Sequence, residues 1–245
     1  MAVNVAISGF GRIGRLVLRS IIESKRKDIN VVAINDLAPV DTNAFLLAND
    51  TVHGPLNEKI SVKKNKMTIG RKTILVLNER DPQKLPWKKM KIDVALECTG
   101  LFTSKEKASM HIKAGAKKVL VSAPCSEADK TIVYGVNEQE ITRNDLVVSN
   151  ASCTTNCLAP VVKVLHEKFG IVHGYMTTIH AFTGDQSVLD TFHPDLRRAR
   201  AASMSMIPTS TGAAKAVGLV MPELSGKLDG TAIRVPTPNL SLIHI

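Results

Sequence analysis

Cys153 stands where a thiol could serve as a nucleophile. An apolar run over residues 146–149 predicts a short strand, and a helical pattern extends from Cys153 to about Phe169. The unpaired backbone amides at a helix start carry partial positive charge, which stabilises the thiolate, the nucleophilic form of cysteine. The same amides can hold an oxyanion formed when sulfur attacks a carbonyl. The sequence therefore predicts a catalytic thiol at Cys153.

A thiol nucleophile needs a general base, and His180 is a candidate at the end of a strand predicted over residues 172–180. Spacing alone cannot select it, because a cysteine and its base meet in space rather than along the chain. We expect Cys157, one helical turn after Cys153, to be a small buried hydrophobe rather than a metal ligand. The other histidines that compete for the role of base are His53, His111, His166, His173 and His193.

A glycine-rich segment, Gly9-Phe10-Gly11-Arg12-Ile13-Gly14, fits the pattern GxGxxG. It follows a strand predicted over residues 3–8 and opens a helix predicted over residues 13–24. In this setting Gly9 permits a tight turn, Gly11 lets the backbone approach a pyrophosphate, and Gly14 lets the helix pack on the strand. The pattern predicts a dinucleotide site.

Asp36 follows a second predicted strand, over residues 31–35, at a distance of 22 residues from Gly14. A carboxylate here can accept hydrogen bonds from ribose hydroxyls, and it would repel the 2′-phosphate of NADP. We therefore predict NAD as the cofactor. The alternative is that Asn35-Asp36 only begins a loop and caps a turn.

Strands and helices alternate through the first half of the chain. Residues 93–97 and 118–122 predict buried strands, and residues 105–114 predict an amphipathic helix between them. This order predicts an α/β fold with a Rossmann-type, doubly wound parallel sheet, followed by an incomplete α+β substrate domain. Alternating polar and apolar residues between about 58 and 78 predict small inserted antiparallel strands. We place an NAD-binding domain at residues 1–150 and a catalytic domain at residues 151–245.

Composition excludes several classes of protein. The chain has 245 residues, 44% hydrophobic and 22% charged, which suits a globular protein of two domains, and no apolar run is long enough to cross a membrane. The formal charge of +10 invites a nucleic-acid interpretation, but the basic residues are scattered and only 4% of residues are aromatic. We therefore expect no nucleic-acid and no membrane partner. The four cysteines and the absence of a secretory signal predict a reduced, cytoplasmic protein.

The segment Ala151-Ser152-Cys153-Thr154-Thr155-Asn156-Cys157 resembles the signature of the phosphorylating glyceraldehyde-3-phosphate dehydrogenase family. The resemblance extends almost along the whole chain, to about Asn239, and its motifs occur in the family's order. The further matching segments are Gly9 to Gly14, Asn35-Asp36, Glu79 to Pro82, Glu97 to Gly100, His180 to Thr183, Arg197 to Arg200, Thr211 to Lys215 and Ile233 to Pro238.

The resemblance assigns roles by position. Cys153 matches the nucleophile and His180 the residue that activates it, which resolves the competition among histidines by analogy. The resemblance implies that Arg12 and Ile13 lie beside the pyrophosphate, and that Asp36, Arg80 and Ser122 contact the cofactor. The residues matched to groups that bind the substrate phosphate or the attacking inorganic phosphate are Ser152, Thr154, Thr183, Arg198, Thr211, Gly212 and Arg234.

The implied reaction is NAD-dependent oxidation and phosphorylation of glyceraldehyde 3-phosphate, in a homotetramer and without a metal. Two other interpretations stay open: a related dehydrogenase acting on erythrose 4-phosphate, and an inactive fragment that only binds a dinucleotide. The family pattern continues for roughly 90 residues beyond Pro238-Asn239, whereas residues 240–245 depart from it. Missing strands would leave open sheet edges. We therefore expect this exact chain to be poorly soluble or inactive.

Overall fold

A computed structural model describes residues 2–239 of the chain, so the departing segment at 240–245 lies outside the described residues. The chain divides into two compact units. The first comprises residues 1–132 and 139–151, and the second comprises residues 133–138 and 152–245.

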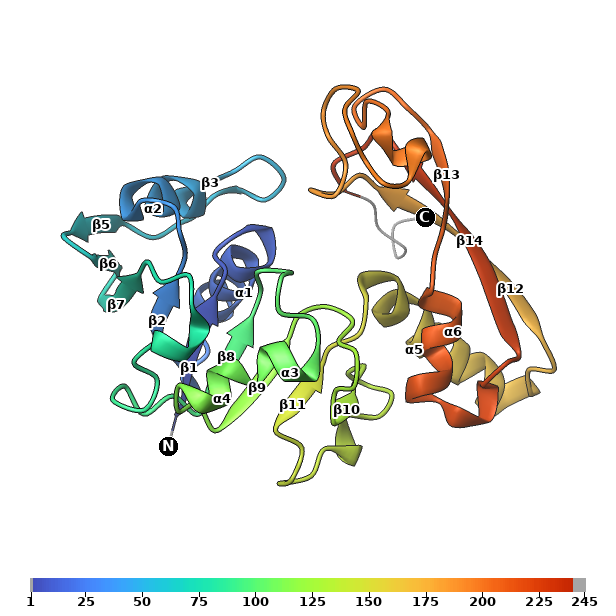
Figure 1. Cartoon of the computed structure of the whole chain (residues 1–245), viewed down its shortest axis with the longest axis horizontal. Coiled ribbons are helices and arrows are strands. Elements are labelled where there is room, and N and C mark those ends of the chain that lie inside the picture. The colour runs from blue at the N-terminus through green and yellow to red at the C-terminus, as the bar shows by residue number, and fades with distance from the viewer. Residues whose placement is uncertain (1, 240–245) are drawn as a thin grey trace. The chain divides into compact units, whose positions relative to one another are not determined.

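The first unit is built on one mixed sheet with the strand order β10-β11-β9-β8-β1-β2-β7-β6-β5. The central strand β1 (Val3–Ser8) lies parallel to β2 (Ile29–Asn35) on one side and to β8 (Val94–Glu97) on the other (Figure 1). The strand order therefore reverses at β1, and the carboxyl end of such a strand is where doubly wound sheets bind ligands. The fold is the Rossmann-type α/β class that the alternation of strands and helices predicts. The other parallel strands are β7 (Lys72–Leu77), β9 (Lys118–Val121), β10 (Lys130–Thr131) and β11 (Val147–Ser149).

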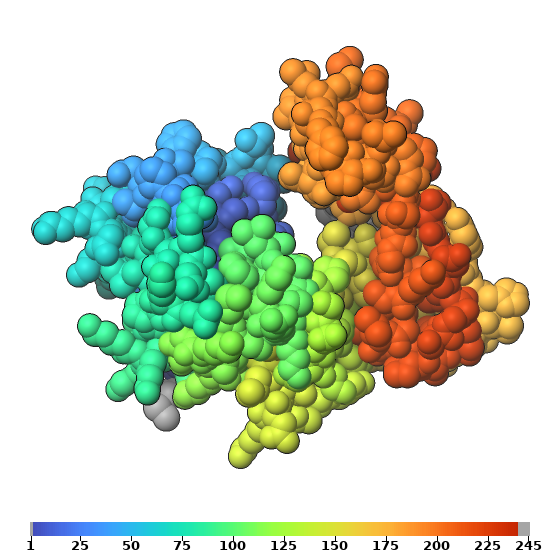
Figure 2. All heavy atoms as spheres, viewed as in Figure 1, coloured from blue at the N-terminus to red at the C-terminus, as the bar shows by residue number. Residues whose placement is uncertain are grey.

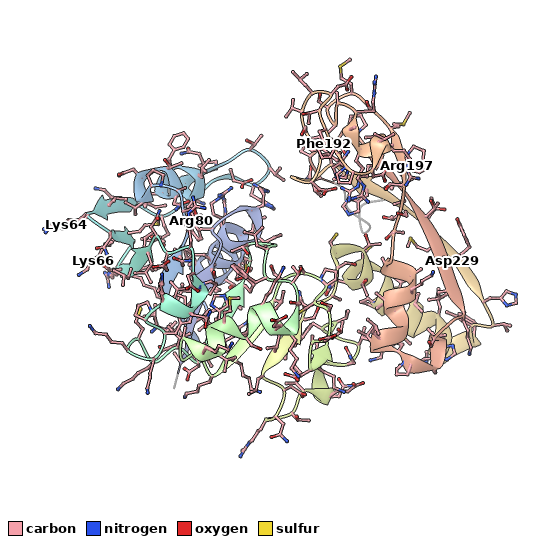
Figure 3. The ribbon with its side chains drawn as sticks, viewed as in Figure 1. Lys64, Lys66, Arg80, Phe192, Arg197 and Asp229 are labelled. Atoms are coloured by element: carbon pink, nitrogen blue, oxygen red, sulfur yellow. The ribbon has the colours of Figure 1, made fainter. Side chains whose placement is uncertain are left out.

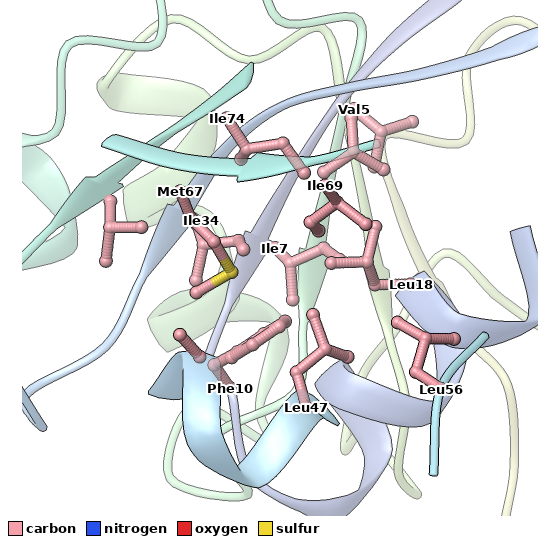
Figure 4. Packing of buried hydrophobic residues seen from close by; sticks show 13 residues of the cluster. Val5, Ile7, Phe10, Leu18, Ile34, Leu47, Leu56, Met67, Ile69 and Ile74 are labelled. Atoms are coloured by element: carbon pink, nitrogen blue, oxygen red, sulfur yellow. The ribbon is translucent and has the colours of Figure 1, made fainter. Parts of the chain in front are cut away.

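Both faces of this sheet are buried. Along β1, Val5 and Ile7 pack into one apolar cluster while Ala6 between them packs into another. The first cluster also holds Phe10 and Leu18 of the glycine-rich turn and helix α1 (Arg12–Glu23) (Figure 4). Burial on both faces explains why the strands read as continuous apolar runs rather than as alternating ones.

Three short strands form the antiparallel margin of the sheet. Strand β6 (Lys66–Ile69) pairs antiparallel with both β5 (Ile60–Lys63) and β7, as the alternation over residues 58–78 predicts. The remaining elements of this unit are α2 (Val40–Ala48), β3 (Asn49–Asp50), β4 (Gly54–Pro55), and the 3-10 turns η1 (Pro82–Lys84) and η2 (Glu138–Glu140), the last of which begins in residues of the second unit.

The helix predicted over residues 105–114 is present but interrupted at one residue. The structure has two short helices, α3 (Lys105–Ala108) and α4 (Met110–Lys113), which meet at Ser109. The Ser109 hydroxyl donates to the carbonyl of Lys105 at 2.6 Å, and its ψ of −10° flattens the turn. A serine that bonds back to the preceding turn competes with the regular helical pattern.

The second unit contains two helices and a three-stranded sheet. Helix α5 (Cys153–Phe169) has the predicted bounds, and strand β12 (Gly174–Ala181) confirms the strand predicted over residues 172–180. Strand β14 (Leu228–Val235) is central in the order β12-β14-β13, parallel to β12 and antiparallel to β13. The other elements are β13 (Ile207–Ser210), α6 (Ala213–Val220), and the 3-10 turns η3 (Leu196–Ala199) and η4 (Pro222–Leu224).

Between β12 and β13, residues 182–206 form a long connection whose only helical turn is η3. In the space-filling view its atoms form the orange lobe of the second unit (Figure 2). Several large apolar side chains of this segment are exposed, with Phe192 88% and Leu189 74% exposed. Large apolar side chains that are exposed in one segment are typical of a surface that another chain covers.

Two glycines of the loop after β1 allow a direct stability test. A Cβ at Gly14 would lie 2.1 Å from the carbonyl oxygen of Gly9, whereas a Cβ at Gly11 would meet nothing within 4 Å. We expect Gly14→Ala to lower the free energy of unfolding by about 2–3 kcal/mol, because the helix must move off the strand. Gly11→Ala, the matched control, should change it by less than about 0.5 kcal/mol. Chemical denaturation of both variants tests this, and equal stabilities would contradict it.

Candidate functional site

A sharp turn presents Cys153 at the start of α5. The chain leaves β11, passes through Ala151 in the left-handed region (φ 55°), and enters the helix at Ser152. Ser152 caps the helix, since its hydroxyl accepts a hydrogen bond from the Thr155 amide at 3.0 Å. Cys153 is therefore the first helical residue, and its side chain is exposed. This is the setting that favours a thiolate.

The structure brings Cys153 and His180 together. The distance from Cys153 Sγ to His180 Nε2 is 3.2 Å. This hydrogen bond is the main cause that lowers the pKa of the Cys153 thiol, and it is also the main cause that raises the pKa of His180. Burial opposes both shifts but does not cancel them. The two shifts together favour a thiolate beside an imidazolium.

The imidazole is oriented by the chain that carries it. His180 Nδ1 lies 2.6 Å from the carbonyl oxygen of Ala181, which can only accept, so Nδ1 carries a proton. The other ring nitrogen, Nε2, is then free to take the thiol proton from Cys153. Because β12 is paired along its whole length with β14, where His180 lies opposite Arg234, the ring is held on a regular strand.

Arg234 forms the centre of a cationic group. Its Nη1 donates to Thr183 Oγ1 at 2.9 Å and to Gln186 Oε1 at 3.1 Å. Its Nε is buried without a hydrogen-bond partner. Burial is the main cause that lowers the Arg234 pKa, followed by the positive charge of Arg198. A guanidinium with an unused buried donor beside a hydroxyl suits a phosphate oxygen.

Arg198 approaches this group from η3. Its Nη1 donates to Asp185 Oδ2 at 2.7 Å and its Nε donates to Thr209 Oγ1 at 3.0 Å. Burial acts to raise the pKa of Asp185, but hydrogen bonds from Arg198 and His193 outweigh it, and the pKa is lowered. The neighbouring Arg197 instead pairs with Asp195 and projects from the same segment (Figure 3). Of this arginine-rich turn, Arg198 is thus the residue that shares the surroundings of Arg234.

The other residues matched to phosphate-binding groups lie at helix starts. Thr154 is a buried residue in the first turn of α5, next to the capping Ser152. Thr211 Oγ1 accepts from the Ala213 amide at 3.2 Å, and Gly212 is the N-cap of α6. The described hydrogen bonds of Ser152 and Thr211 run to their own helix starts, not to the Arg234 group.

In the first unit, Asp36 holds the glycine-rich turn. Its Oδ2 accepts from the Phe10 amide at 2.7 Å, and its Oδ1 accepts from the Ala38 amide at 2.8 Å. Asn43 Nδ2 also donates to Oδ1 at 3.4 Å, so Oδ2 keeps a lone pair for a further donor, since each carboxylate oxygen can accept two hydrogen bonds. Asp36 therefore also makes the local turn contacts that the alternative interpretation predicts, and the two roles are compatible.

The remaining predicted cofactor contacts surround the carboxyl ends of the strands. Arg12 is exposed and pairs with Asp50, and Ile13 is also exposed at the start of α1. Ser122, which follows β9, donates its hydroxyl to the carbonyl of Glu97 at 3.1 Å. Arg80 lies after β7 and is labelled in Figure 3. The open space around Gly11 fits the backbone approach that a pyrophosphate needs.

One prediction about the cysteines is wrong. Cys157 is exposed rather than buried, because α5 is covered on only part of its surface and this side of the second turn faces solvent. Desolvation and the neighbouring Cys153 nevertheless raise the pKa of the Cys157 thiol. All four cysteines are free.

Several residues near these groups carried no recognisable signal. Ala151 takes a left-handed conformation that glycine or asparagine would have indicated. Asp185 and Gln186 look like ordinary loop residues but hold Arg198 and Arg234. Glu97 and His111 form a buried pair, although the sequence offered His111 only as a competing base. Only the order of the matched segments could have drawn attention to Glu97.

None of the helices in the described range is long and apolar enough to cross a membrane. Within residues 2–239, no group of three or more histidine, cysteine, aspartate or glutamate side chains could hold a metal ion.

Comparison with known proteins places both units in one class, the dehydrogenases that pair an NAD-binding domain with a catalytic one. Residues 3–105 match the family model described as glyceraldehyde 3-phosphate dehydrogenase, NAD binding domain. Residues 152–245 match the model of the C-terminal domain of the same enzyme. The chain belongs to the glyceraldehyde-3-phosphate dehydrogenase family.

Curated relatives agree along the whole chain. The chain is 65% identical to a glyceraldehyde-3-phosphate dehydrogenase of Xanthobacter flavus, over 100% of this chain and 73% of the relative. It is 63% identical to the enzyme of Cereibacter sphaeroides, with the same coverage. It is 56% identical to that of Geobacillus stearothermophilus, also over 100% of this chain and 73% of the relative.

The thiol and imidazole pair makes alkylation pH-dependent. Because the Cys153 pKa is lowered, its reaction with iodoacetamide should persist below the ordinary thiol pKa of about 8.5 and decline only as the pH falls through the lowered value. His180→Asn removes the main cause of the shift, so the rate at pH 7 should fall about tenfold. Above about pH 9.5 the alkylation rates of the unmodified chain and of His180→Asn should converge, since Cys153 is then ionised in both proteins.

Stopped-flow alkylation with mass-spectrometric assignment to Cys153 would measure both profiles. Cys153→Ser is the control for the slow background of Cys157, whose pKa is raised. If His180→Asn left the alkylation rate of Cys153 at pH 7 unchanged, His180 would not be the group that lowers the Cys153 pKa.

Proposed function

We propose that the residues of this chain are those of an enzyme that catalyses the NAD-dependent oxidation and phosphorylation of glyceraldehyde 3-phosphate to 1,3-bisphosphoglycerate. The observation that carries the proposal is the 3.2 Å contact between Cys153 and His180 at the start of α5. Family membership supports the substrate, since the matching relatives are named for it. The cofactor follows from the NAD-binding family model over residues 3–105.

In the first step the Cys153 sulfur forms a bond to the aldehyde carbon. The carbonyl π electrons move to the oxygen, which takes the proton that His180 Nε2 holds as an imidazolium. The backbone amides at the start of α5 stabilise the negative charge that develops on this oxygen. The product is a thiohemiacetal on Cys153.

In the second step His180 accepts the hydroxyl proton of the thiohemiacetal, and the thiohemiacetal carbon loses a hydride. NAD, when bound, supplies the acceptor for that hydride. The carbon is now oxidised to a thioester. An oxygen of inorganic phosphate then forms a bond to this carbon, the bond to sulfur breaks, and Cys153 is regenerated as a thiolate that the His180 imidazolium stabilises.

We assign the substrate phosphate and the attacking phosphate to the polar groups of the second unit. Arg234 with Thr183, and Arg198 beside them, supply forked donors and a hydroxyl. Ser152, Thr154, Thr211 and Gly212 supply hydroxyls and amides at helix starts. Two anion sites are needed because substrate and attacking group each carry a phosphate.

For the cofactor, the glycine-rich turn supplies a space that a Cβ at Gly11 would fill. We propose that Gly9, Gly11 and Gly14, with Arg12 and Ile13, receive the pyrophosphate. In this proposal Asp36 accepts from the ribose hydroxyls, and Arg80 and Ser122 contact the rest of the dinucleotide. The proposal thus divides the functions between residues 1–150, which bind NAD, and residues 151–245, which carry the catalysis.

We further propose a cytoplasmic homotetramer. Free cysteines suit a reducing compartment. The exposed apolar residues of the segment 182–206 suit burial against another copy of the chain.

Replacement of the nucleophile separates binding from chemistry. Cys153→Ser should lower turnover by at least about a thousandfold, since a hydroxyl is a far weaker nucleophile at neutral pH, while NAD binding stays within about twofold. NADH absorbance with glyceraldehyde 3-phosphate, with and without inorganic phosphate, measures turnover, and calorimetric titration measures binding. Substantial turnover in Cys153→Ser would refute the proposed function, and so would turnover that does not depend on phosphate.

Cofactor preference depends on the charge of Asp36. NADP should bind this chain at least about tenfold more weakly than NAD, because its 2′-phosphate would face the carboxylate. Asp36→Asn keeps an oxygen that can accept from the Phe10 amide but removes the negative charge. It should therefore reduce the difference between the affinities for NAD and NADP. Titration of both nucleotides tests this, with Asp41→Asn, an exposed acidic residue of α2, as control. Equal affinities in the unmodified chain would show that Asp36 does not select NAD.

A further inference from the structure

A chain of hydrogen bonds runs through the buried part of the first unit and ends at the glycine-rich turn. Trp87 Nε1 donates to His111 Nδ1 at 3.0 Å, and His111 Nε2 lies 2.9 Å from Glu97 Oε2. Each of these three residues has at most 1% of its surface exposed. Buried polar groups are costly unless they are paired, and a paired buried network holds its members in fixed positions.

The proton positions in this chain are determined by its first member. The indole nitrogen can only donate, so His111 Nδ1 must accept and carries no proton. The ring is then protonated at Nε2 and donates to Glu97. The Glu97 side chain is left as a pure acceptor, which takes hydrogen bonds from His111 on one oxygen and from Thr99 on the other.

The far end of the chain fixes Thr99. Glu97 Oε1 accepts from the Thr99 amide at 2.7 Å and also from the Thr99 hydroxyl. The same hydroxyl accepts from the Leu101 amide at 3.0 Å, which closes the turn through Gly100. Glu97 also anchors Ser122, because its carbonyl accepts from the Ser122 amide and hydroxyl.

This turn is in close contact with the dinucleotide loop. A Cβ at Gly9 would lie 2.6 Å from the Thr99 nitrogen and 2.7 Å from the carbonyl carbon of Cys98. The amide of Cys98 also donates to the carbonyl of Ser8 at 2.7 Å. The backbone around Thr99 therefore forms one wall of the glycine-rich turn, and any displacement of Thr99 changes the space that this turn encloses.

We propose that Trp87, His111 and Glu97 act as positioning residues that hold the Thr99 turn against Gly9 and thereby set the affinity for NAD. This inference rests on the proposed cofactor role of the glycine-rich turn. None of the three residues needs to contact the dinucleotide. Their effect is transmitted through the hydrogen bonds that the Glu97 side chain accepts from Thr99.

Glu97→Gln is a nearly isosteric test. In the native chain His111 donates to one Glu97 oxygen and Thr99 donates to the other. A carboxamide offers only one acceptor oxygen, because an NH2 group takes the place of the second oxygen. His111 cannot change its proton position, since Trp87 donates to Nδ1. One donor must therefore face another donor, and we expect the dissociation constant for NAD to rise about tenfold.

A second substitution should reverse this effect. Trp87→Phe removes the indole donor, so His111 can carry its proton on Nδ1 and accept at Nε2 from the carboxamide that Glu97→Gln introduces. We expect the double variant Trp87→Phe with Glu97→Gln to bind NAD more tightly than Glu97→Gln alone. The effects of the two substitutions on NAD affinity would then not add. Such non-additivity indicates coupling through His111, because two substitutions that merely destabilise the fold would not compensate for each other.

Two variants at the Thr99 end keep the test valid if the buried variants fail to fold. Thr99→Val removes the hydroxyl but keeps the shape, and it should weaken NAD binding about threefold. Thr99→Ser keeps the hydroxyl and should retain the original affinity. Glu106→Gln, at an exposed carboxylate of α3, is the matched control and should leave the affinity unchanged.

Calorimetric titration of the whole chain with NAD measures every affinity, and alkylation of Cys153 reports on the second unit in the same samples. The inference predicts weaker NAD binding with an unchanged alkylation rate. If the unmodified chain binds NAD but Glu97→Gln and Thr99→Val bind it equally well, the positioning role is wrong. If the unmodified chain does not bind NAD, the proposed cofactor site itself fails.

Discussion

The hydrogen bond between Cys153 and His180 is the interaction on which the proposed chemistry of this chain depends. A thiol at its ordinary pKa is mostly protonated at neutral pH and therefore reacts slowly. The structure changes this by two means: α5 begins at Cys153, and β12 places the His180 imidazole 3.2 Å from the sulfur. The carbonyl of Ala181, at the end of β12, accepts from Nδ1 and so leaves Nε2 free for the thiol proton.

In the first unit, too, polar groups lie at the ends of strands. Asp36 follows β2, Glu97 ends β8 and Ser122 follows β9. Parallel strands bring these ends to one edge of the sheet, where the order reverses at β1. Side chains that lie far apart in the sequence therefore meet without long loops, and a backbone amide or carbonyl fixes each of them.

Much of this arrangement could be predicted from the sequence, because its causes are local. Apolar runs predict the strands of the parallel sheet, and the pattern after Cys153 predicts the bounds of α5. The pairing of Cys153 with His180 could not be derived from spacing, because it depends on how the fold of the second unit brings His180 of β12 to the start of α5. The break at Ser109 and the exposure of Cys157 were missed for a related reason: each depends on which groups a helix meets in the folded unit.

Ala151 shows why the least predictable backbone feature lies close to Cys153. A left-handed conformation costs alanine about 1–2 kcal/mol, whereas glycine would adopt it freely. Glycine would, however, have more freedom to lose on folding, and the packing of the buried Ala151 methyl group would be lost. The Ala151 amide is held by Ser149 Oγ at 3.1 Å, and Ser152 caps the helix on the other side. Hydrogen bonds on both sides thus impose the strained backbone, and the result is a turn that can present the sulfur in only one direction.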